Sequence, residues 1–178
     1  MPAPLVRDAT ASDAAACAAI YAPYVTDTAV TFETEPPTVA EMVLRIEGAQ
    51  RRHAWLVIEL DGAIAGYAYA GPFKERAAYR WSCEVSVYLD PDHHGRGAGR
   101  LLYEALLTRL AKRGFRMAAA GMTQPNKASG RLHAALGFET VGTFRAVGWK
   151  HGAWRDVTWV QRPLAGALPD FGDPPEPV

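Results

Sequence analysis

The sequence predicts an α/β fold (an α+β mixed sheet) in which a central twisted sheet is flanked by helices. Three observations support this class. Strand-like segments and amphipathic helical segments follow one another along most of the chain. The turn Asp61-Gly62 joins two apolar segments in the manner of a β-hairpin. A strand ending near Leu89 leads through a glycine-rich turn into a helix, a strand–turn–helix unit typical of such sheets.

The chain length of 178 residues suits one domain with a sizeable core. We assign residues 1–165 to that domain. Residues 166–178 are rich in proline and poor in patterned apolar residues, so we expect them to form a disordered tail.

The predicted elements of the first half are a strand, two helices and the two strands of the hairpin, over residues 5–8, 13–25, 38–50, 55–60 and 63–70. Thr10 or Ser12 can cap the first helix. Thr38 and Glu41 have the spacing of a capping box at the start of the second. The dipeptide Gly71-Pro72 is expected to end the hairpin.

The second half alternates strands and helices over residues 82–89, 97–112, 115–122 and 126–136, and ends with two strands over 140–147 and 154–161. Leu102, Leu106 and Leu110 recur at helical spacing and predict the buried face of the third helix, which Gly114 ends. Asn126 has the position of an N-cap for the fourth helix.

Composition excludes several classes of function. Basic and acidic residues both number 19, and no basic stripe is present, so no nucleic-acid partner is expected. No apolar run reaches membrane-spanning length, and Arg7, Asp8 and Asp13 interrupt the N-terminal segment where a signal peptide is apolar. We expect a cytoplasmic protein with no membrane partner. Cys17 and Cys83 fit no ligand spacing, so no metal is expected.

The glycine-rich turn is the most specific motif. Its glycines Gly95, Gly97 and Gly99 alternate with Arg96, Ala98 and Arg100. Glycines allow backbone N–H groups to approach an anion closely, and the following helix adds the positive end of its dipole. The spacing matches neither a Rossmann motif nor a P-loop. The sequence therefore predicts a phosphate site, the alternative being a turn that only redirects the chain.

The motif His94-Gly95-Arg96-Gly97-Ala98-Gly99 resembles the acetyl-CoA loop of the GNAT superfamily of N-acetyltransferases, Gln/Arg-x-x-Gly-x-Gly/Ala, with His94 where Gln or Arg is usual. The predicted order of elements also matches the GNAT acyl-CoA N-acyltransferase fold. The resemblance covers residues 5–164. It implies acetyl-CoA as co-substrate and no metal.

Alternation along the strand 82–89 separates two sets of side chains. Cys83, Val85, Val87 and Leu89 are expected in the core, and Ser82, Glu84, Ser86 and Tyr88 on the other face. A carboxylate there can accept a proton from an ammonium group, which must be neutral before it attacks a thioester. We interpret Glu84 as this general base; the alternative is a solvated or salt-bridged glutamate.

The fourth helix carries a second candidate cluster. Asn126, Ser129 and His133 share one stripe, while Ala128, Leu132 and Leu136 form an apolar one. The segment NKASGRLHAALGF resembles the GNAT pattern in which a Tyr protonates the leaving thiolate, with His133 in place of that Tyr. We expect His133 as a proton donor, with a surface histidine as the alternative. Two alternatives stay open: Tyr88 is the donor, or neither His133 nor Tyr88 is.

The loop after the hairpin contains several basic residues. Lys74, Arg76 and Arg80 can hold the carboxylate or phosphinyl oxygens of an amino-acid-like substrate, and Glu75 lies among them. The alternative is a solvated loop. Phe32, in the irregular segment after the first helix, is a candidate cover for the substrate.

Several segments resemble one branch, the phosphinothricin and methionine sulfoximine N-acetyltransferases: TFETEP, YAYAGPFKERAAYRW, EVSVYLDPDHHGRGAGRLLYEALL and GWKHGAWRDVTWVQR. The resemblance implies Glu84 as catalytic carboxylate, a homodimer and a role in herbicide resistance. It implies an amino-acid site lined by Lys74, Glu75, Arg76, Glu84, Val85 and Ser86. It implies acetyl-CoA contacts from Val87, Tyr88, Leu89, the residues Gly95 to Arg100, and Asn126, beside which Ser129 lies.

The leading hypothesis is therefore acetyl transfer from acetyl-CoA to the α-amino group of a small amino-acid analogue by direct attack. Two alternatives stay open: an acetyltransferase for another amine (an antibiotic, a polyamine or a protein N-terminus), and a non-catalytic acyl-CoA sensor. His94 and the sequence of the loop 74–76 depart from the usual branch pattern, and the loop leaves the substrate open.

Overall fold

The computed structural model describes residues 3–164 and 175–178. These residues form a seven-stranded mixed sheet in the order β1-β2-β3-β4-β5-β7-β6. Its strands are β1 (Leu5–Asp8), β2 (Ala54–Leu60), β3 (Ala63–Pro72), β4 (Ser82–Leu89), β5 (Met117–Thr123), β6 (Glu139–Lys150) and β7 (Ala153–Pro163). The predicted order of elements and the mixed sheet are confirmed.

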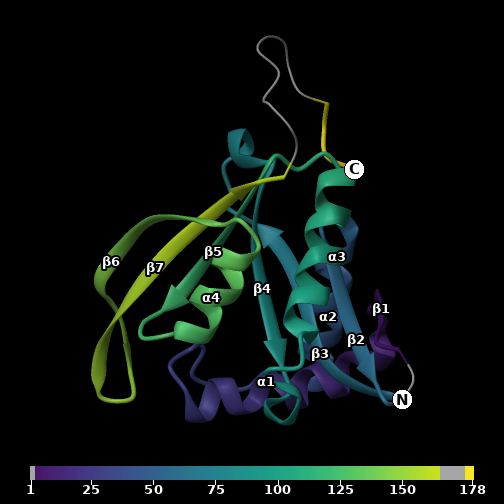
Figure 1. Ribbon diagram of the computed structural model, residues 1–178, viewed down its shortest axis with the longest axis horizontal. Helices are drawn as coiled ribbons and strands as arrows, with labels where there is room; N and C mark the ends of the chain where they lie inside the picture. The colour runs from purple at the N-terminus through teal and green to yellow at the C-terminus, as the bar shows by residue number, and fades with distance from the viewer. Residues whose placement is uncertain (1–2, 165–174) are drawn as a thin grey trace.

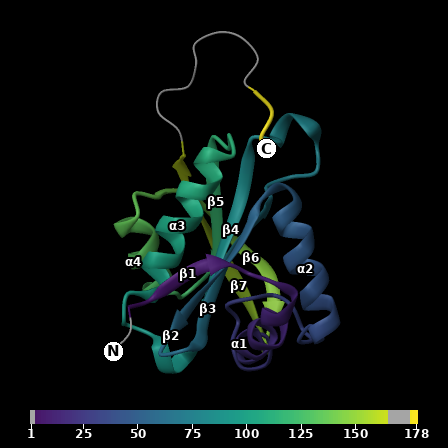
Figure 2. The ribbon, with the colours of Figure 1, turned by 90° about the vertical axis from the view of Figure 1, so that its right-hand side faces the viewer.

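Helices cover both faces of the sheet, α1 and α2 on one side and α3 and α4 on the other (Figures 1 and 2). Their bounds are α1 (Ala14–Asp27), α2 (Val39–Arg52), α3 (Ala98–Lys112) and α4 (Lys127–Ala135). Short 3-10 turns precede α1, β4 and α3. Two boundaries differ from prediction: β3 continues through Gly71 and Pro72, and the last two strands are longer on both sides of their turn.

Local chemistry explains the helix ends. Thr38 Oγ1 accepts from the Glu41 amide at 3.2 Å, and the Glu41 carboxylate accepts from the Thr38 amide at 2.7 Å, so the predicted capping box forms. Gly114 stops α3 in a left-handed conformation at φ +91°. Leu102, Leu106 and Leu110 are fully buried against the sheet, as their spacing predicts.

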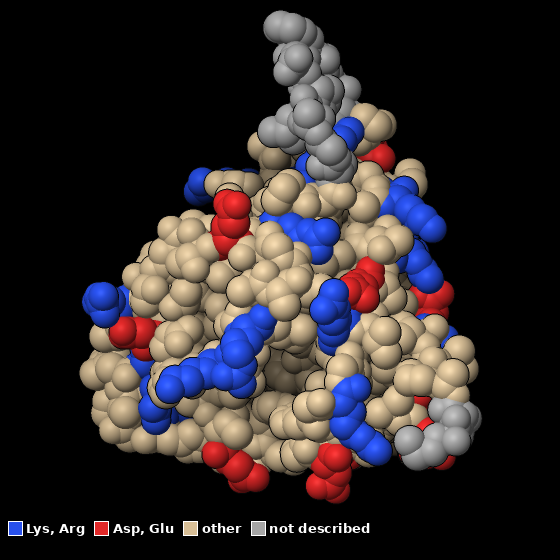
Figure 3. All heavy atoms as spheres, viewed as in Figure 1, with Lys and Arg blue, Asp and Glu red and all other residues tan. Residues whose placement is uncertain are grey.

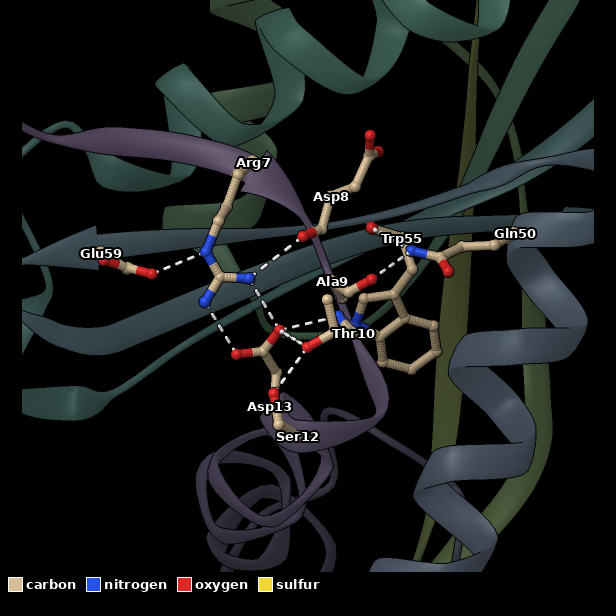
Figure 4. A network of polar contacts seen from close by, with 9 residues as sticks. All are labelled: Arg7, Asp8, Ala9, Thr10, Ser12, Asp13, Gln50, Trp55 and Glu59. Carbon is tan, nitrogen blue, oxygen red and sulfur yellow. Dashed lines mark hydrogen bonds and ion pairs between the residues drawn. The ribbon is translucent and has the colours of Figure 1, made fainter.

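An ion-pair network anchors the N-terminal strand (Figure 4). The Arg7 guanidinium donates to Glu59 on β2 at 2.6 Å and to both oxygens of Asp13 at 2.8 Å. The Arg7 hydrogen bonds lower the pKa of Asp13 to about 2. One guanidinium thus joins β1, β2 and the start of α1.

The sheet opens between β4 and β5. These strands pair in parallel only from Ser82–Met117 to Glu84–Ala119. Beyond Glu84 they separate, so the following residues of β4 have no partner strand on that edge within the described part of the chain. Backbone polar groups on such an edge need another partner. The fold therefore presents a strand edge directly in front of the glycine-rich turn.

Most of the predicted tail, residues 165–174, lies outside the described residues. The last four residues, 175–178, contact the domain. Trp81 Nε1 donates to the Pro175 carbonyl at 2.8 Å, and the Val178 amide donates to Arg113 O at 2.9 Å. Glu176 forms an ion pair with Arg80 at 2.7 Å.

Candidate active site

A cavity of about 50 Å³ lies in the opening between β4 and β5. We call it the split cavity. It is lined by residues 85–88 of β4, residues 120–122 of β5, Val30, Tyr103 and the inner side of α4. This volume admits a group of a few atoms and no whole nucleotide cofactor. Such a space suits the reactive end of a longer ligand.

The glycine-rich turn, residues 94–100, lies at the end of β4 and begins α3. Gly95 and Gly97 have φ of +73° and +82°, and a Cβ at either would meet nothing within 4 Å. Backbone conformation, and not lack of space, therefore requires glycine at both positions. Gly97 is the N-cap of α3, so the free N–H groups of the first helical turn lie beside it.

Side chains from α1 hold this turn in place. Tyr24 OH donates to Leu89 O at 2.7 Å and lies 3.0 Å from His94 Nε2. His94 thus has a partner within the fold where the related pattern carries Gln or Arg. Arg100 pairs with Glu104 at 2.7 Å on the exposed side of α3. The turn and the open edge of β4 together offer backbone donors to an anionic, extended ligand.

The face carrying α3 and α4 is hollowed near the end of β4, and Lys and Arg side chains border the hollow on both sides (Figure 3). Cations around a concave opening raise the local concentration of an anionic ligand. The backbone donors and the cationic rim both fit the phosphates of acetyl-CoA.

Glu84 projects from the opposite face of β4, as the strand alternation predicts. Its neighbours Cys83 and Val85 are buried on the α3 side, while Glu84 is half-buried. Burial raises the pKa of Glu84, and the nearby Lys74 ammonium partly opposes this. Its cross-strand neighbour is Gly71, where a Cβ would meet nothing within 4 Å. A carboxylate with a raised pKa and open space beside it can accept a proton.

His133 is not the surface histidine of the alternative interpretation, because only 3% of it is exposed. Its Nδ1 lies 2.8 Å from Ser129 O, which only accepts, so Nδ1 carries the proton. Its Nε2 lies 3.2 Å from Tyr103 OH and therefore accepts. Burial lowers the pKa of His133. A neutral ring with both nitrogens occupied opposes the expectation that His133 donates a proton near neutral pH.

The predicted polar stripe of α4 is correct in position, and in the predicted apolar stripe Leu136 is buried and Leu132 packs against the core. Asn126 caps the helix, with its side chain accepting from the Ser129 amide at 3.1 Å, and the stripe through Ser129 and His133 faces the split cavity. Ala128, expected on an apolar face, is exposed. Tyr103 on α3 was missed by the sequence reasoning, because its position in an apolar stripe gives no sign of its hydroxyl contact with His133.

Of the three cations of the loop after β3, Lys74 and Arg76 line one cavity together with Glu75, and Arg80 does not line it. Lys74 lies over the rings of Phe73 and Trp159, at 5.2 and 5.9 Å from their centroids. Arg80 turns away: it pairs with Glu176 and stacks on Trp81 at 3.7 Å. Arg80 is therefore held by Glu176 and Trp81, whereas Lys74 is the loop cation that acts on the pKa of Glu84. Glu75 and Arg76 are exposed.

Lys74 lines a second cavity of about 460 Å³, which we call the Trp159 cavity. Ala119, which pairs with Glu84 across the sheet, also lines it, together with Thr143, Phe144, Trp159 and Gln161. Paired residues of neighbouring strands project to the same face, so this cavity opens on the Glu84 side. Alternation along the last strand places Trp159 with Gln161, but sequence alone does not say which face they occupy.

Comparison with known proteins agrees with this geometry. The sequence profile of the acetyltransferase (GNAT) domain matches residues 6–159. The chain belongs to the GNAT acetyltransferase family. It is accordingly an acetyl-CoA-dependent N-acetyltransferase, and the resemblance stated from its motifs is confirmed.

Named relatives of this acetyltransferase cover nearly the whole chain. A phosphinothricin N-acetyltransferase of Streptomyces viridochromogenes is 43% identical over 97% of this chain and 92% of its own. An L-methionine sulfoximine/L-methionine sulfone acetyltransferase of Salmonella typhimurium is 34% identical over 93% and 98%. The crystal structure of a phosphinothricin acetyltransferase from Sinorhizobium meliloti with AcCoA has a TM-score of 0.91, at 38% identity over 97% and 94%.

Among residues 3–164 and 175–178, no three His, Cys, Asp or Glu side chains are grouped so that they could hold a metal ion. No helix in the same residues is long and apolar enough to cross a membrane.

Proposed function

We propose that this acetyltransferase moves acetyl from acetyl-CoA to the α-amino group of a small amino-acid analogue of the phosphinothricin or methionine sulfoximine type. The observation that carries the proposal is Glu84, a half-buried carboxylate of raised pKa. It precedes Val85 of the split cavity on β4 and pairs with Ala119 of the Trp159 cavity on β5. The names of the most similar relatives support the substrate class. Resistance to a herbicide of this class would be a consequence.

Acetyl-CoA supplies an activated acetyl group as a thioester. In the proposal, the pyrophosphate binds the backbone of the glycine-rich turn, where Gly95 and Gly97 adopt positive φ and Arg96 and Arg100 add charge. The backbone of Val87, Tyr88 and Leu89 pairs with the extended arm along the open edge of β4. Asn126 and Ser129 border the thioester end.

Glu84 acts as the general base of the transfer. It takes a proton from the substrate ammonium, directly or through a water, and the neutral nitrogen attacks the thioester carbonyl carbon. The C–N bond forms, the C–S bond breaks, and the sulfur leaves as a thiolate that takes up a proton. No covalent enzyme intermediate is needed, because both free cysteines, Cys17 and Cys83, are buried with pKa values raised to about 12.

Tyr88 is the better of the two candidate proton donors. It lines the split cavity, and burial raises its pKa well above the usual value, so the phenol stays protonated. His133 lines the same cavity but is a neutral ring held by Ser129 and Tyr103. We assign His133 the role of orienting α4 beside the thioester.

Lys74 is proposed to hold the acidic end of the substrate. It lies over an aromatic pair at the rim of the Trp159 cavity and is close enough to affect the pKa of Glu84. A substrate whose carboxylate or phosphinyl oxygen meets Lys74 can present its amine to Glu84. Arg76 and Glu75 border the same loop, and Val85 and Ser86 continue β4 beneath the site. Arg80 is left out of this site.

We also propose a homodimer in the cytoplasm. The β6–β7 hairpin carries large apolar side chains exposed to solvent: Val141, Phe144, Val147, Trp149 and Trp154. Such a patch on a folded protein is typical of an interface. Light scattering should give twice the chain mass, and Trp149→Lys should shift the protein toward monomer. A monomer at micromolar concentration would contradict the proposal.

A panel of amines tests the substrate class. Thiol release from acetyl-CoA should be fastest with phosphinothricin or methionine sulfoximine, and far slower with spermidine, an aminoglycoside or a peptide N-terminus. A preference for the polyamine or the aminoglycoside would contradict the assignment of an amino-acid substrate. The assignment of acetyltransferase activity would still hold. Binding of acetyl-CoA without release for any amine would favour the sensor.

A further inference from the structure

A buried lysine at the end of β6 holds the segment that follows α1. Lys150 is only 6% exposed, and its Nζ donates to Thr31 O and Glu33 O, both at 2.8 Å. These carbonyls flank Phe32. The contact spans 119 residues of sequence, so it joins the β6–β7 hairpin to an otherwise irregular part of the chain.

Two neighbours of Lys150 complete the contact. Gly148 lies two residues earlier, on the same side of β6, and a Cβ there would overlap three carbons of the Phe32 ring. The absence of a side chain at this position lets the ring pack against the strand. His151 Nε2 lies 3.1 Å from Thr28 O. The hairpin therefore contacts the 28–33 segment at its start, around Phe32 and beyond it.

The opposite side of the 28–33 segment faces the reaction site. Val30 lines the split cavity. Tyr21 OH lies 2.6 Å from Thr31 Oγ1, and the Tyr21 ring meets Tyr88 edge-on with centroids 4.8 Å apart. Tyr88 belongs to β4, four residues beyond Glu84. Displacement of this segment would thus alter the space beside the acetyl group and the proposed base.

A lysine is chemically suited to this position. Its ammonium satisfies two carbonyls of an irregular segment, and Glu33 supplies a compensating charge. Arg45 holds Glu33 from α2 at 2.7 and 2.9 Å, so that carboxylate stays ionised. Removing the ammonium would leave the carbonyls of residues 31 and 33 unpaired in a buried place, which favours a shifted segment.

We propose that Lys150 is a positioning residue for the amine acceptor, because it fixes the 28–33 segment with Phe32 against Gly148 and Val30 beside the split cavity. Lys150 touches no reactant and acts through Phe32 and Val30. The inference rests on the proposed function only in assigning the effect to binding of the amine and not to binding of acetyl-CoA. We call the contacts of Lys150 and Gly148 with the 28–33 segment the clamp. The evidence for the clamp is independent of the proposed function.

Kinetics with Lys150→Met test the effect on the reaction. Methionine preserves the length of the side chain without its donors. The KM for the amine should rise about tenfold or more through lost orientation, while the KM for acetyl-CoA changes less than about twofold. Lys112→Met on the exposed side of α3 is the matched control and should change neither. An equal rise in both KM values, or no rise, would overturn the proposal.

Gly148→Ala and Phe32→Ala test whether the effect passes through the ring. Gly148→Ala keeps Lys150 but displaces Phe32, so it should raise the amine KM in the same way. In a double-mutant cycle, Lys150→Met should add little to Phe32→Ala, since both disturb one contact. Full additivity would show that Lys150 acts elsewhere, and the proposal would be dropped.

Hydrogen exchange separates this inference from the substrate assignment. Amides in peptides covering residues 28–35 should exchange faster in Lys150→Met, while those of α3 stay unchanged. This expectation does not depend on which amine the protein accepts. The kinetic measurements with Lys150→Met use the amine that reacts fastest in the panel. Unchanged exchange at 28–35 overturns the clamp even if phosphinothricin is a substrate. Faster exchange in a protein that does not acetylate phosphinothricin would support the clamp and contradict the substrate assignment.

Discussion

Around β4, the half of the site that faces β5 and the glycine-rich turn is made mainly of backbone, whereas the half that surrounds Glu84 is made of side chains. The first half consists of two left-handed glycines, the N-terminus of α3 and a strand edge that has no partner strand among the residues the structure describes. The second depends on Glu84, Lys74 and Trp159, which come from three separate elements.

This difference explains why one half is recognisable from a short motif and the other is not. Backbone geometry is encoded locally, and few side chains at those positions contribute contacts. A side-chain pocket is encoded by whichever residues the tertiary fold brings together. It can change its ligand by single substitutions while the backbone half binds the same co-substrate.

The largest effect is expected from Glu84→Gln, which keeps the shape of the side chain and removes its capacity to accept a proton. Turnover should fall on the order of a hundredfold or more, with the acetyl-CoA thermal shift unchanged. The control is Glu47→Gln on the exposed side of α2. Turnover within about threefold of wild type would assign Glu84 a structural role.

The pH profile sharpens the same comparison. Burial raises the pKa of Glu84, so the carboxylate becomes protonated, and inactive as a base, at a pH where an ordinary glutamate is still ionised. As the pH falls through this raised pKa, kcat/KM should fall with it. Glu84→Gln should lack that acid limb, while acetyl-CoA binding should be level across the same range in both proteins.

Gly97→Asp should have the next largest effect, confined to the backbone half. It places a side chain and a negative charge beside the proposed phosphate site and strains a residue at φ +82°. The Kd for acetyl-CoA, measured by calorimetry, should rise about tenfold or more, since backbone donors and helix dipole are both opposed.

Gly62→Asp provides the matched control, because Gly62 has φ +83° and equally open surroundings in the β2–β3 turn. Both variants should lose about 1–3 kcal/mol of unfolding free energy from strain. Only Gly97→Asp should lose affinity for acetyl-CoA. Equal affinities in the two variants would contradict the assignment of the turn.

The sequence was informative where the governing interactions are local. The capping box at Thr38, the left-handed glycines and the parity that separates Glu84 from Cys83 all depend on a few neighbouring residues. It was misleading where distant residues decide. Arg80 pairs with Glu176, 96 positions later, and the buried His133 contacts Tyr103 on another helix. Lys150 lies in the segment GWKHGAWRDVTWVQR, but nothing in that segment indicates its partners, which lie near the other end of the chain.

A smaller effect should separate Tyr88→Phe from His133→Gln. Phenylalanine keeps the aromatic contacts with Tyr21 and Tyr24 but removes the proposed donor. Since a thiolate is a good leaving group, kcat should fall only about tenfold, below the usual range for a general acid. His133→Gln should mainly lower the melting temperature. The reverse pattern in kcat would restore His133 as the donor.

The smallest effect is expected from Arg80→Met, and its value lies in the pairing with Lys74→Met. Both substitutions remove one cation from the same loop, so a general electrostatic role would make them equal. Arg80 is already neutralised by Glu176 and held over Trp81, whereas Lys74 faces the Trp159 cavity. Lys74→Met should therefore raise the amine KM several-fold, on the order of one charge-assisted hydrogen bond. Arg80→Met should change it less than about twofold, as for an exposed ion pair. If Arg80→Met raised the amine KM as much as Lys74→Met, the substrate would have to displace Glu176, and the last residues of the chain would belong to the acceptor half of the site.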